Sequence, residues 1–261
     1  MRYCGIVILF FLSFSGHSQS VFSKAFTIQT TADLLTSDAL GNIYIINGSE
    51  IVKYNEKGQI CCTFSNRNFG AITSIDARDP LRILLFYKPF SMVILLDNNL
   101  TEQTSINLNS LEIYDPLLVC NSETQGIWVY DNATARLYKF DSKLQAVGLS
   151  NDLQQDVMKH ILPIMMTESD YWLVILEKEN LLVFDKMGNY FKSIHLGNHN
   201  GGQLIHDDWI YNSTEKVIRL NLRTGVSSVI ELPFIPYNSR IVLAPQIMMH
   251  LKEKTLDVYS Y

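Results

Sequence analysis

The chain has 261 residues, of which 47% are hydrophobic, 11% aromatic and 18% charged. So many apolar side chains exclude an intrinsically disordered chain and allow a sizeable buried core, and few charges with many aromatics are typical of an all-β protein. The formal net charge is -5 and the sequence has no run of Lys or Arg, so nucleic acid is not an expected partner.

The first 18 residues have the pattern of an export signal. Arg2 gives a positive start, residues 4–14 form an uncharged apolar run, and small residues lead up to Ser18. The run is too short to span a bilayer, although a membrane anchor is the alternative. We predict a signal peptide over residues 1–18, cleaved after Ser18, with residues 19–261 exported to the periplasm or cell surface. The segment resembles the export signals of Bacteroidetes.

No transmembrane segment is expected after the signal peptide, because no later stretch reaches 18 uncharged apolar residues. Three cysteines remain in the mature chain, Cys61, Cys62 and Cys120. Neighbouring residues of a strand point to opposite faces, so Cys61 and Cys62 are poorly placed to pair with each other. The number of cysteines is odd and their spacing is not that of a zinc site, so we expect three free thiols.

An apolar strand that ends in an aromatic residue or Leu, followed by Asn, Asp or Ser, recurs six times. The turn residues that follow it are Asn55, Asp97, Asp141, Asp185, Asn221 and Ser260. A second apolar segment precedes each copy at a nearly constant distance, over residues 41–46, 82–87, 126–131, 171–176, 208–213 and 247–252. A repeat of about 40 residues is one blade of four short strands, so the pattern predicts an all-β, six-bladed β-propeller over residues 19–261.

The two remaining strands of each unit are less regular. Polar, alternating outer strands are predicted over residues 59–64, 103–108, 189–196 and 226–232. Innermost strands are predicted over residues 32–38, 71–77, 116–122, 161–169, 201–207 and 240–245. The sixth unit ends at its third strand, while residues 23–30 supply one extra strand. We therefore expect the N-terminal strand to complete the last blade, which closes the ring without exposed edges.

The first unit carries a recognisable repeat motif. It reads D-x-x-G-N-I-Y-I, then a short turn, then I-x-K-Y-N-x-x-G, with matches at Asp38, Gly41, Asn42, Ile43, Tyr44, Ile51, Lys53, Tyr54, Asn55 and Gly58. This unit resembles the repeats of NHL-type and TolB-like propellers, whereas the later units keep only the hydrophobic frame and the turn residue. The resemblance implies a platform fold that serves both enzymes and binding modules.

Carboxylates at or just after four of the predicted innermost strands are the candidate metal ligands. Asp38, Asp76, Glu168 and Asp207 would bind Ca²⁺ if they converged on a central channel, as in propeller lactonases. The alternative is that these residues start turns. His195 and His199 are a second candidate pair, but nearby glycines favour a solvated loop there. Motifs of serine hydrolases, dinucleotide-binding folds and P-loops are absent, so no catalytic residue and no nucleotide cofactor is predicted.

Two functions remain open from the sequence. The first is a non-enzymatic interaction platform that binds a protein or glycan of the cell envelope and needs no cofactor. The alternative is a metal-dependent hydrolase or lactonase with a divalent cation, such as Ca²⁺, in the central channel. Partner and substrate are not specified by any motif.

Overall fold

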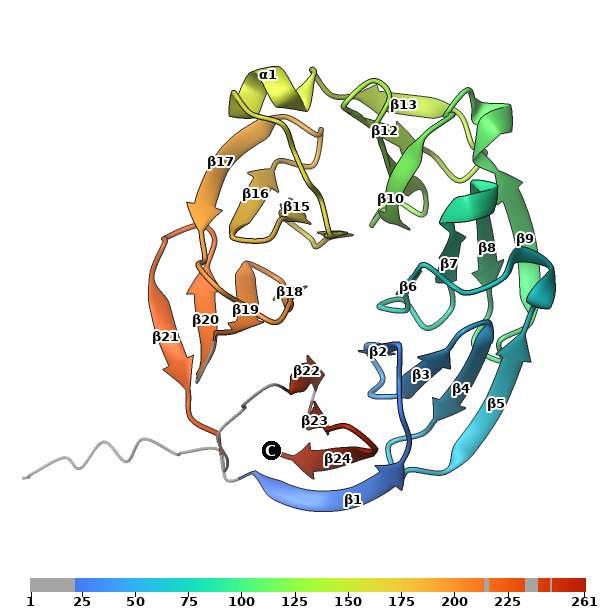
Figure 1. Ribbon diagram of the computed structural model, residues 1–261, viewed down its shortest axis with the longest axis vertical. Coiled ribbons are helices and arrows are strands. Elements are labelled where there is room, and N and C mark those ends of the chain that lie inside the picture. The colour runs from blue at the N-terminus through green and yellow to red at the C-terminus, as the bar shows by residue number, and fades with distance from the viewer. Residues whose placement is uncertain (1–21, 214–215, 233–238, 245) are drawn as a thin grey trace, which may run out of the picture.

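The fold is a closed ring of six antiparallel sheets, each with four strands (Figure 1). The computed structural model describes residues 22–213, 216–232, 239–244 and 246–261. The predicted all-β, six-bladed propeller is therefore confirmed, while the predicted signal peptide lies outside the described residues. No helix in these ranges is long and apolar enough to traverse a lipid bilayer.

Four sets of strands run from the axis to the rim of the ring. The innermost are β2 (Leu34–Ser37), β6 (Ser74–Asp76), β10 (Pro116–Asn121), β14 (Met165–Glu168), β18 (Gly202–Ile205) and β22 (Arg240–Ala244). The second are β3 (Ile43–Asn47), β7 (Ile83–Tyr87), β11 (Ile127–Asp131), β15 (Leu173–Leu176), β19 (Asp208–Asn212) and β23 (Ile247–Leu251). The third are β4 (Glu50–Tyr54), β8 (Met92–Leu96), β12 (Arg136–Phe140), β16 (Asn180–Phe184), β20 (Val217–Asn221) and β24 (Thr255–Ser260).

The outer strands are β5 (Ile60–Ser65), β9 (Glu102–Asn107), β13 (Ala146–Leu149), β17 (Tyr190–His195), β21 (Ser227–Ile230) and β1 (Ser23–Gln29). Blades 1 to 5 each use four consecutive strands, starting from β2, and blade 6 combines β22–β24 with β1. Neither β13 nor the short helix α1 (Leu153–Val157), which follows it, was predicted from the sequence. The β13 segment is only four residues long and contains Gly148, so it lacks the alternation that marks the other outer strands.

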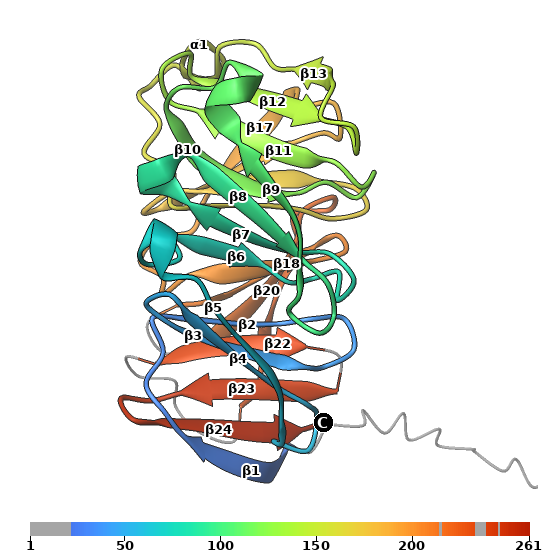
Figure 2. The same ribbon diagram turned by 90° about the vertical axis from the view of Figure 1, so that its right-hand side faces the viewer.

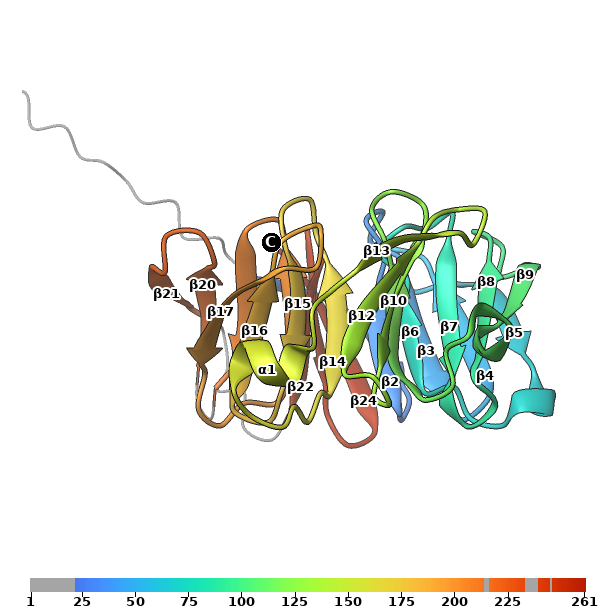
Figure 3. The same cartoon turned by 90° about the horizontal axis from the view of Figure 1, so that it is seen from above.

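Burial follows the position of a strand in its blade. The second strand β7 is buried along its whole length, because neighbouring blades cover both of its faces. The outer strand β17 alternates between half-buried and exposed residues, since one side of it meets water. Figures 2 and 3 show the ring from two sides, with strands running between its two faces. The face of the ring that carries the connections from innermost to second strands is called the turn face. The other face is called the opposite face.

The N-terminal strand closes the ring as the sequence predicted. β1 pairs antiparallel with β24 from Ser23↔Ser260 to Gln29↔Thr255, and Figure 1 shows it along the outside of blade 6. Phe26 and Ile28 pack on the apolar cluster that blade 6 shares with blade 1. A Cβ atom at Gly58, whose φ is +74, would lie 2.7 Å from the Phe26 ring. β1 therefore contacts both of the blades that meet at the closure.

A buried carboxylate fastens β1 to the end of the chain. Asp257 of β24 accepts a hydrogen bond from Thr27 Oγ1 (2.7 Å) and forms ion pairs with Lys24 (2.7 Å) and Lys252 (2.6 Å). Burial alone would raise the pKa of Asp257, but the hydrogen bonds from Lys24, Lys252 and Thr27 hold it well below its usual value of 3.8. Asp257 is therefore charged at neutral pH, and its contacts join the N-terminal strand to residues at the other end of the chain.

Loss of the apolar face of β1 should destabilise the whole propeller. Replacement of Phe26 and Ile28 together by Lys places two charges in the closure cluster and should lower the melting temperature by at least about 5 °C. The control is Ala25→Lys, which changes an exposed residue of the same strand. If thermal scans give the double variant the same melting temperature as the control, β1 does not stabilise the ring.

Candidate functional site on the turn face

The four carboxylates proposed as metal ligands belong to four different blades. Asp76 and Glu168 are the last residues of β6 and β14, and Asp38 and Asp207 lie just after β2 and β18. All four therefore lie at the turn face, as the sequence indicated. Each of them accepts hydrogen bonds from neighbouring groups, and three of the four do so across an interface between blades.

Asp38 organises the turn of blade 1. Its Oδ1 accepts hydrogen bonds from the main-chain N–H groups of Leu40 and Asn42, both at 2.9 Å. Its Oδ2 accepts from the Asn42 amide at 2.7 Å and from the hydroxyl of Tyr44 at 2.8 Å. The carboxylate is 2% exposed, so it is buried with several donors around it. Asp38 therefore has the role of a turn starter.

Asp76 joins blade 2 to blade 3. Arg78 donates to it through Nε (2.9 Å) and Nη2 (2.7 Å), and the main-chain N–H of Asn121 in blade 3 donates to Oδ2 at 3.0 Å. Burial would raise the pKa of Asp76, but the Arg78 charge and these hydrogen bonds keep it below its usual value. The buried carboxylate is therefore ionised, and its bonds to Arg78 and Asn121 fix the blade interface.

Glu168 joins blade 4 to blade 3 and is fully buried. Its oxygens accept hydrogen bonds from the main-chain N–H of Glu123 (2.6 Å) and from the indole N–H of Trp128 (3.0 Å). The ammonium of Lys139 lies 3.6 Å from Glu168 Oε1 and 4.8 Å from the centre of the Trp128 ring. A cation, an indole and a peptide N–H therefore surround this single carboxylate.

Asp207 joins blade 5 to blade 4. Oδ1 accepts a hydrogen bond from the indole N–H of Trp172 at 2.8 Å, and Oδ2 lies 3.3 Å from Nε of Arg223. The guanidinium of Arg223 also lies over the ring of Tyr171, 4.9 Å from its centre. This carboxylate therefore holds aromatic and cationic side chains together at the rim of the turn face.

The other sequence candidates also take part in local contacts. His195 Nδ1 is 3.3 Å from the side-chain oxygen of Asn180, and His199 Nε2 is 3.1 Å from the Glu177 carbonyl. Within the described part of the chain, no three His, Cys, Asp or Glu side chains gather in a group that could hold a metal ion. The calcium site stays a prediction. Cys61, Cys62 and Cys120 are free thiols.

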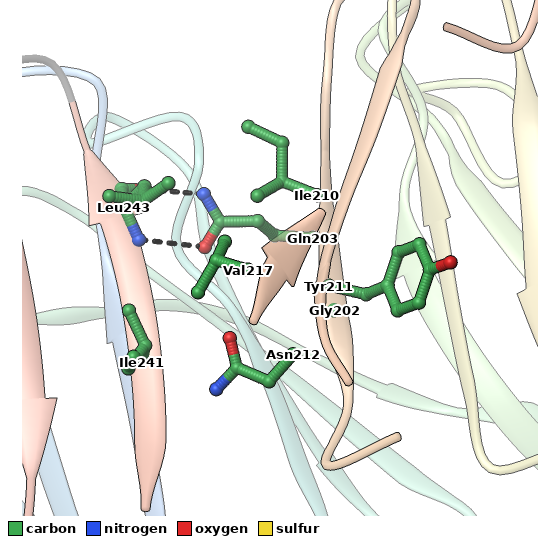
Figure 4. Close-up of a pocket in the computed structure, with 8 residues that line it drawn as sticks. All are labelled: Gly202, Gln203, Ile210, Tyr211, Asn212, Val217, Ile241 and Leu243. Atoms are coloured by element: carbon green, nitrogen blue, oxygen red, sulfur yellow. Dashed lines mark hydrogen bonds between the residues drawn. The ribbon is translucent and has the colours of Figure 1, made fainter. Parts of the chain in front are cut away.

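A direct amide contact joins blades 5 and 6 (Figure 4). The side chain of Gln203 donates to the Leu243 carbonyl at 2.6 Å and accepts from the Leu243 N–H at 2.9 Å, like an extra residue of the neighbouring strand. A cavity of about 10 Å³ beside it is bordered by Ile210 and Ile241. That volume holds roughly one water molecule, so this feature is a blade interface and not a ligand pocket.

A larger cavity lies between the turns of blades 2 and 3. Its volume is about 60 Å³ and its wall includes Arg78, Asp79, Arg82, Asn121, Ser122 and Glu123. None of these six residues was selected from the sequence, because the two turns that supply them lie about 40 residues apart and carry no shared motif. The sequence feature that could have identified them is the presence of acidic and basic residues in the innermost-to-second turns of two neighbouring blades.

The turn face also exposes large apolar side chains at one recurring position. Three innermost-to-second turns each present one, and the exposed fractions are 66% for Leu40, 74% for Leu81 and 49% for Tyr171. In blades 1 and 2 the N–H of this residue donates at 2.9 Å to an Asp side chain two positions earlier. In blade 4 the N–H of Tyr171 donates to the hydroxyl of Ser169, also two positions earlier, at 3.5 Å. The turn geometry therefore fixes which side chain points to solvent.

Comparison with known proteins supports the fold and leaves the function open. No family model and no curated protein matches the sequence. Among solved structures, the Neurospora crassa Pan2 WD40 domain is similar over 92% of this chain and 95% of that chain, with 10% identity and a TM-score of 0.63. A catalytically inactive virginiamycin B lyase from Staphylococcus aureus with quinupristin is similar over 90% and 99%, with 10% identity and a TM-score of 0.62.

A chain in the mitotic checkpoint complex covers 100% of this chain and 99% of its own length, with 7% identity and a TM-score of 0.65. At such low identity these likenesses show the propeller fold alone. They include a WD40 domain and lyases, and they carry no argument for either function considered from the sequence. The resemblance of residues 38–58 to NHL-type and TolB-like repeats stays a prediction.

Removal of the Glu168 carboxylate should destabilise the ring strongly. Glu168→Leu leaves the donors of Trp128 and Glu123 without their acceptor, and it leaves the Lys139 ammonium, which still donates to the Lys186 carbonyl at 3.2 Å, without its counter-charge. Breaking a buried pair in this way costs roughly 3–5 kcal/mol of unfolding free energy. Denaturant unfolding at neutral pH measures the loss, with the exposed-turn variant Glu56→Gln as control. A Glu168→Leu variant as stable as the control would contradict the assigned role.

Proposed function

We propose that this propeller is an exported, non-enzymatic interaction platform, and that it binds a protein or glycan of the cell envelope on its turn face. The observation that carries the proposal is the exposure of Leu40, Leu81 and Tyr171 by equivalent turns of three blades. Apolar side chains held by short hydrogen-bonded turns lose little conformational entropy on binding. They therefore suit docking better than the same residues on long loops.

The contacts of the carboxylates favour this proposal over a metal-dependent hydrolase. Calcium needs several oxygen ligands that converge on one point. Asp76 is paired with Arg78, and Glu168 is surrounded by Lys139 and Trp128. A calcium site made from these residues would require each of them to leave its present donors, which costs the free energy of the broken pairs.

Export is the second part of the proposal and rests on the sequence of residues 1–18. A signal peptide cleaved after Ser18 gives a mature chain that starts at Gln19, four residues before β1. N-terminal sequencing of the protein recovered from cell fractions should find Gln19, within about two residues, in the periplasmic or surface fraction. Retention of residues 1–18 on the recovered protein would refute cleavage and favour the membrane-anchor alternative.

If the partner docks on the turn face, substitution of exposed residues on this face should reduce partner binding, and substitution of exposed residues on the opposite face should not. The test variant replaces Leu40, Leu81 and Tyr171 by Ser. The matched control replaces three exposed apolar residues of the opposite face by Ser: Phe90, Met158 and Leu162. Both tagged proteins are cross-linked in the native envelope and purified, and co-purified protein and glycan are quantified.

We expect the test variant to lose its partner by at least about 10-fold, while the control retains it, since a few central anchors dominate such interfaces. Equal recovery with both variants would refute docking through these three residues. Elemental analysis of the same preparations tests the alternative. Stoichiometric calcium that disappears when Asp38 and Asp76 are replaced by Asn would favour the metal-dependent hydrolase.

A further inference from the structure

The cavity between blades 2 and 3 has the size of a small ligand head group. Its volume is about 60 Å³, and one buried water needs roughly 10–15 Å³, so it holds several waters or a few non-hydrogen atoms. Its wall is polar and carries two arginines and two carboxylates. Opposite charges that are partly buried at one place usually pair with each other. A charged group of this wall that lacks such a partner is therefore available to a ligand.

Arg82 supplies a positive charge that lacks an ion-pair partner. Its Nη1 donates to the Gly126 carbonyl at 2.6 Å, which fixes the guanidinium at the blade interface. In the described ranges, no carboxylate lies within ion-pair distance of Arg82, whereas Arg78 is paired with Asp76 at 2.7 Å. Burial lowers the pKa of Arg82, although Asp79 and Asp76 oppose this shift. A partly buried guanidinium that has no carboxylate partner attracts an anion that enters the cavity.

Glu123 supplies a negative charge with only a distant partner. Its Oε1 lies 3.7 Å from Arg78 Nη1, longer than a hydrogen bond, and its side chain is 40% exposed. Burial raises the pKa of Glu123, Arg78 lowers it and Asp170 raises it. This carboxylate therefore has room to accept a hydrogen bond from a cation that enters the cavity.

Asn121 adds an acceptor without a donor. The residue is 6% exposed, and its amide N–H₂ donates to the carbonyls of Asp76 (3.3 Å) and Arg82 (2.8 Å), which sets the orientation of the amide. Its Oδ1 has no hydrogen-bond partner in the described part of the chain. Because this oxygen is itself buried, Asn121 contributes to the wall of the cavity and no ligand contact is assigned to it.

We propose that this cavity binds the zwitterionic head group of a free α-amino acid, with its carboxylate on Arg82 and its ammonium facing Glu123. A zwitterion satisfies an unpaired cation and an under-used anion at once and adds no net charge to the cavity. Leu81 belongs to the same turn as Asp79 and Arg82 but does not line the cavity, so amino-acid binding does not require a partner docked on the exposed apolar residues.

Calorimetric titration of the mature chain with three probes tests the charge requirement. L-alanine carries both charges, N-acetyl-L-alanine only the carboxylate, and L-alanine methyl ester only the ammonium. We expect L-alanine to bind at least about 10-fold more tightly than either derivative, because each derivative lacks one ionic contact. Absence of L-alanine binding, or equal affinity for L-alanine and N-acetyl-L-alanine, would overturn the proposal.

Two variants assign the contacts. Glu123→Gln should weaken L-alanine binding at least about 5-fold and leave the affinity for N-acetyl-L-alanine unchanged, because only the ammonium contact is lost. Arg82→Gln should abolish binding of both, and Arg82→Lys, which retains the charge, should restore part of it. Glu56→Gln, an exposed carboxylate on the turn of another blade, is the control, and thermal melts verify folding. If Glu123→Gln weakens both ligands equally, the assignment of the ammonium is wrong.

Discussion

The ring depends on polar contacts between neighbouring blades, most of them at the turn face. Apolar clusters fill each interface, but apolar packing is not directional and would allow blades to slide past one another. Hydrogen bonds have fixed partners, and a buried donor or acceptor that loses its partner costs far more than the bond contributes. A hydrogen bond from an innermost strand or its turn to the neighbouring blade therefore fixes the position of one blade relative to the next.

Such a bond occurs at successive interfaces and differs in chemistry from one to the next. Blades 1 and 2 are joined by main-chain groups, Ala39 N–H to the Arg78 carbonyl at 3.2 Å. A carboxylate bridges blades 2 and 3 and another bridges blades 3 and 4. Ser169 donates to the His206 carbonyl at 2.7 Å between blades 4 and 5, and an amide joins blades 5 and 6. At the closure the bond lies at the opposite face, where Arg240, the first residue of β22, donates to the carbonyl of Asp33, just before β2, at 3.1 Å, alongside the pairing of β1 with β24.

The strands could be predicted from the sequence because their signals are local. Apolar alternation and a turn residue such as Asn55 or Asp185 occur within a few positions of each other, and six copies reinforce one another. The pairing of β1 with β24 was predictable only because the repeat left one strand missing and one in excess. The bonds between blades could not be predicted, since Glu168 and Trp128 are 40 residues apart and no periodic signal connects them.

The same reasoning explains why the carboxylates were correctly placed at the turn face while their contacts were not anticipated. Position follows from the strand that precedes each residue, whereas the partner follows from the neighbouring blade. Acidic residues such as Asp76 and Glu168 are bound to donors that hold blades in place, so a substitution there changes stability. The exposed side chains of Leu40 and Leu81 follow the same turns but contact little of the protein, so their identity can change with little effect on the fold. Recognition by this propeller is therefore most readily carried by residues that the ring itself does not require, and stability and binding can vary independently along the same turns.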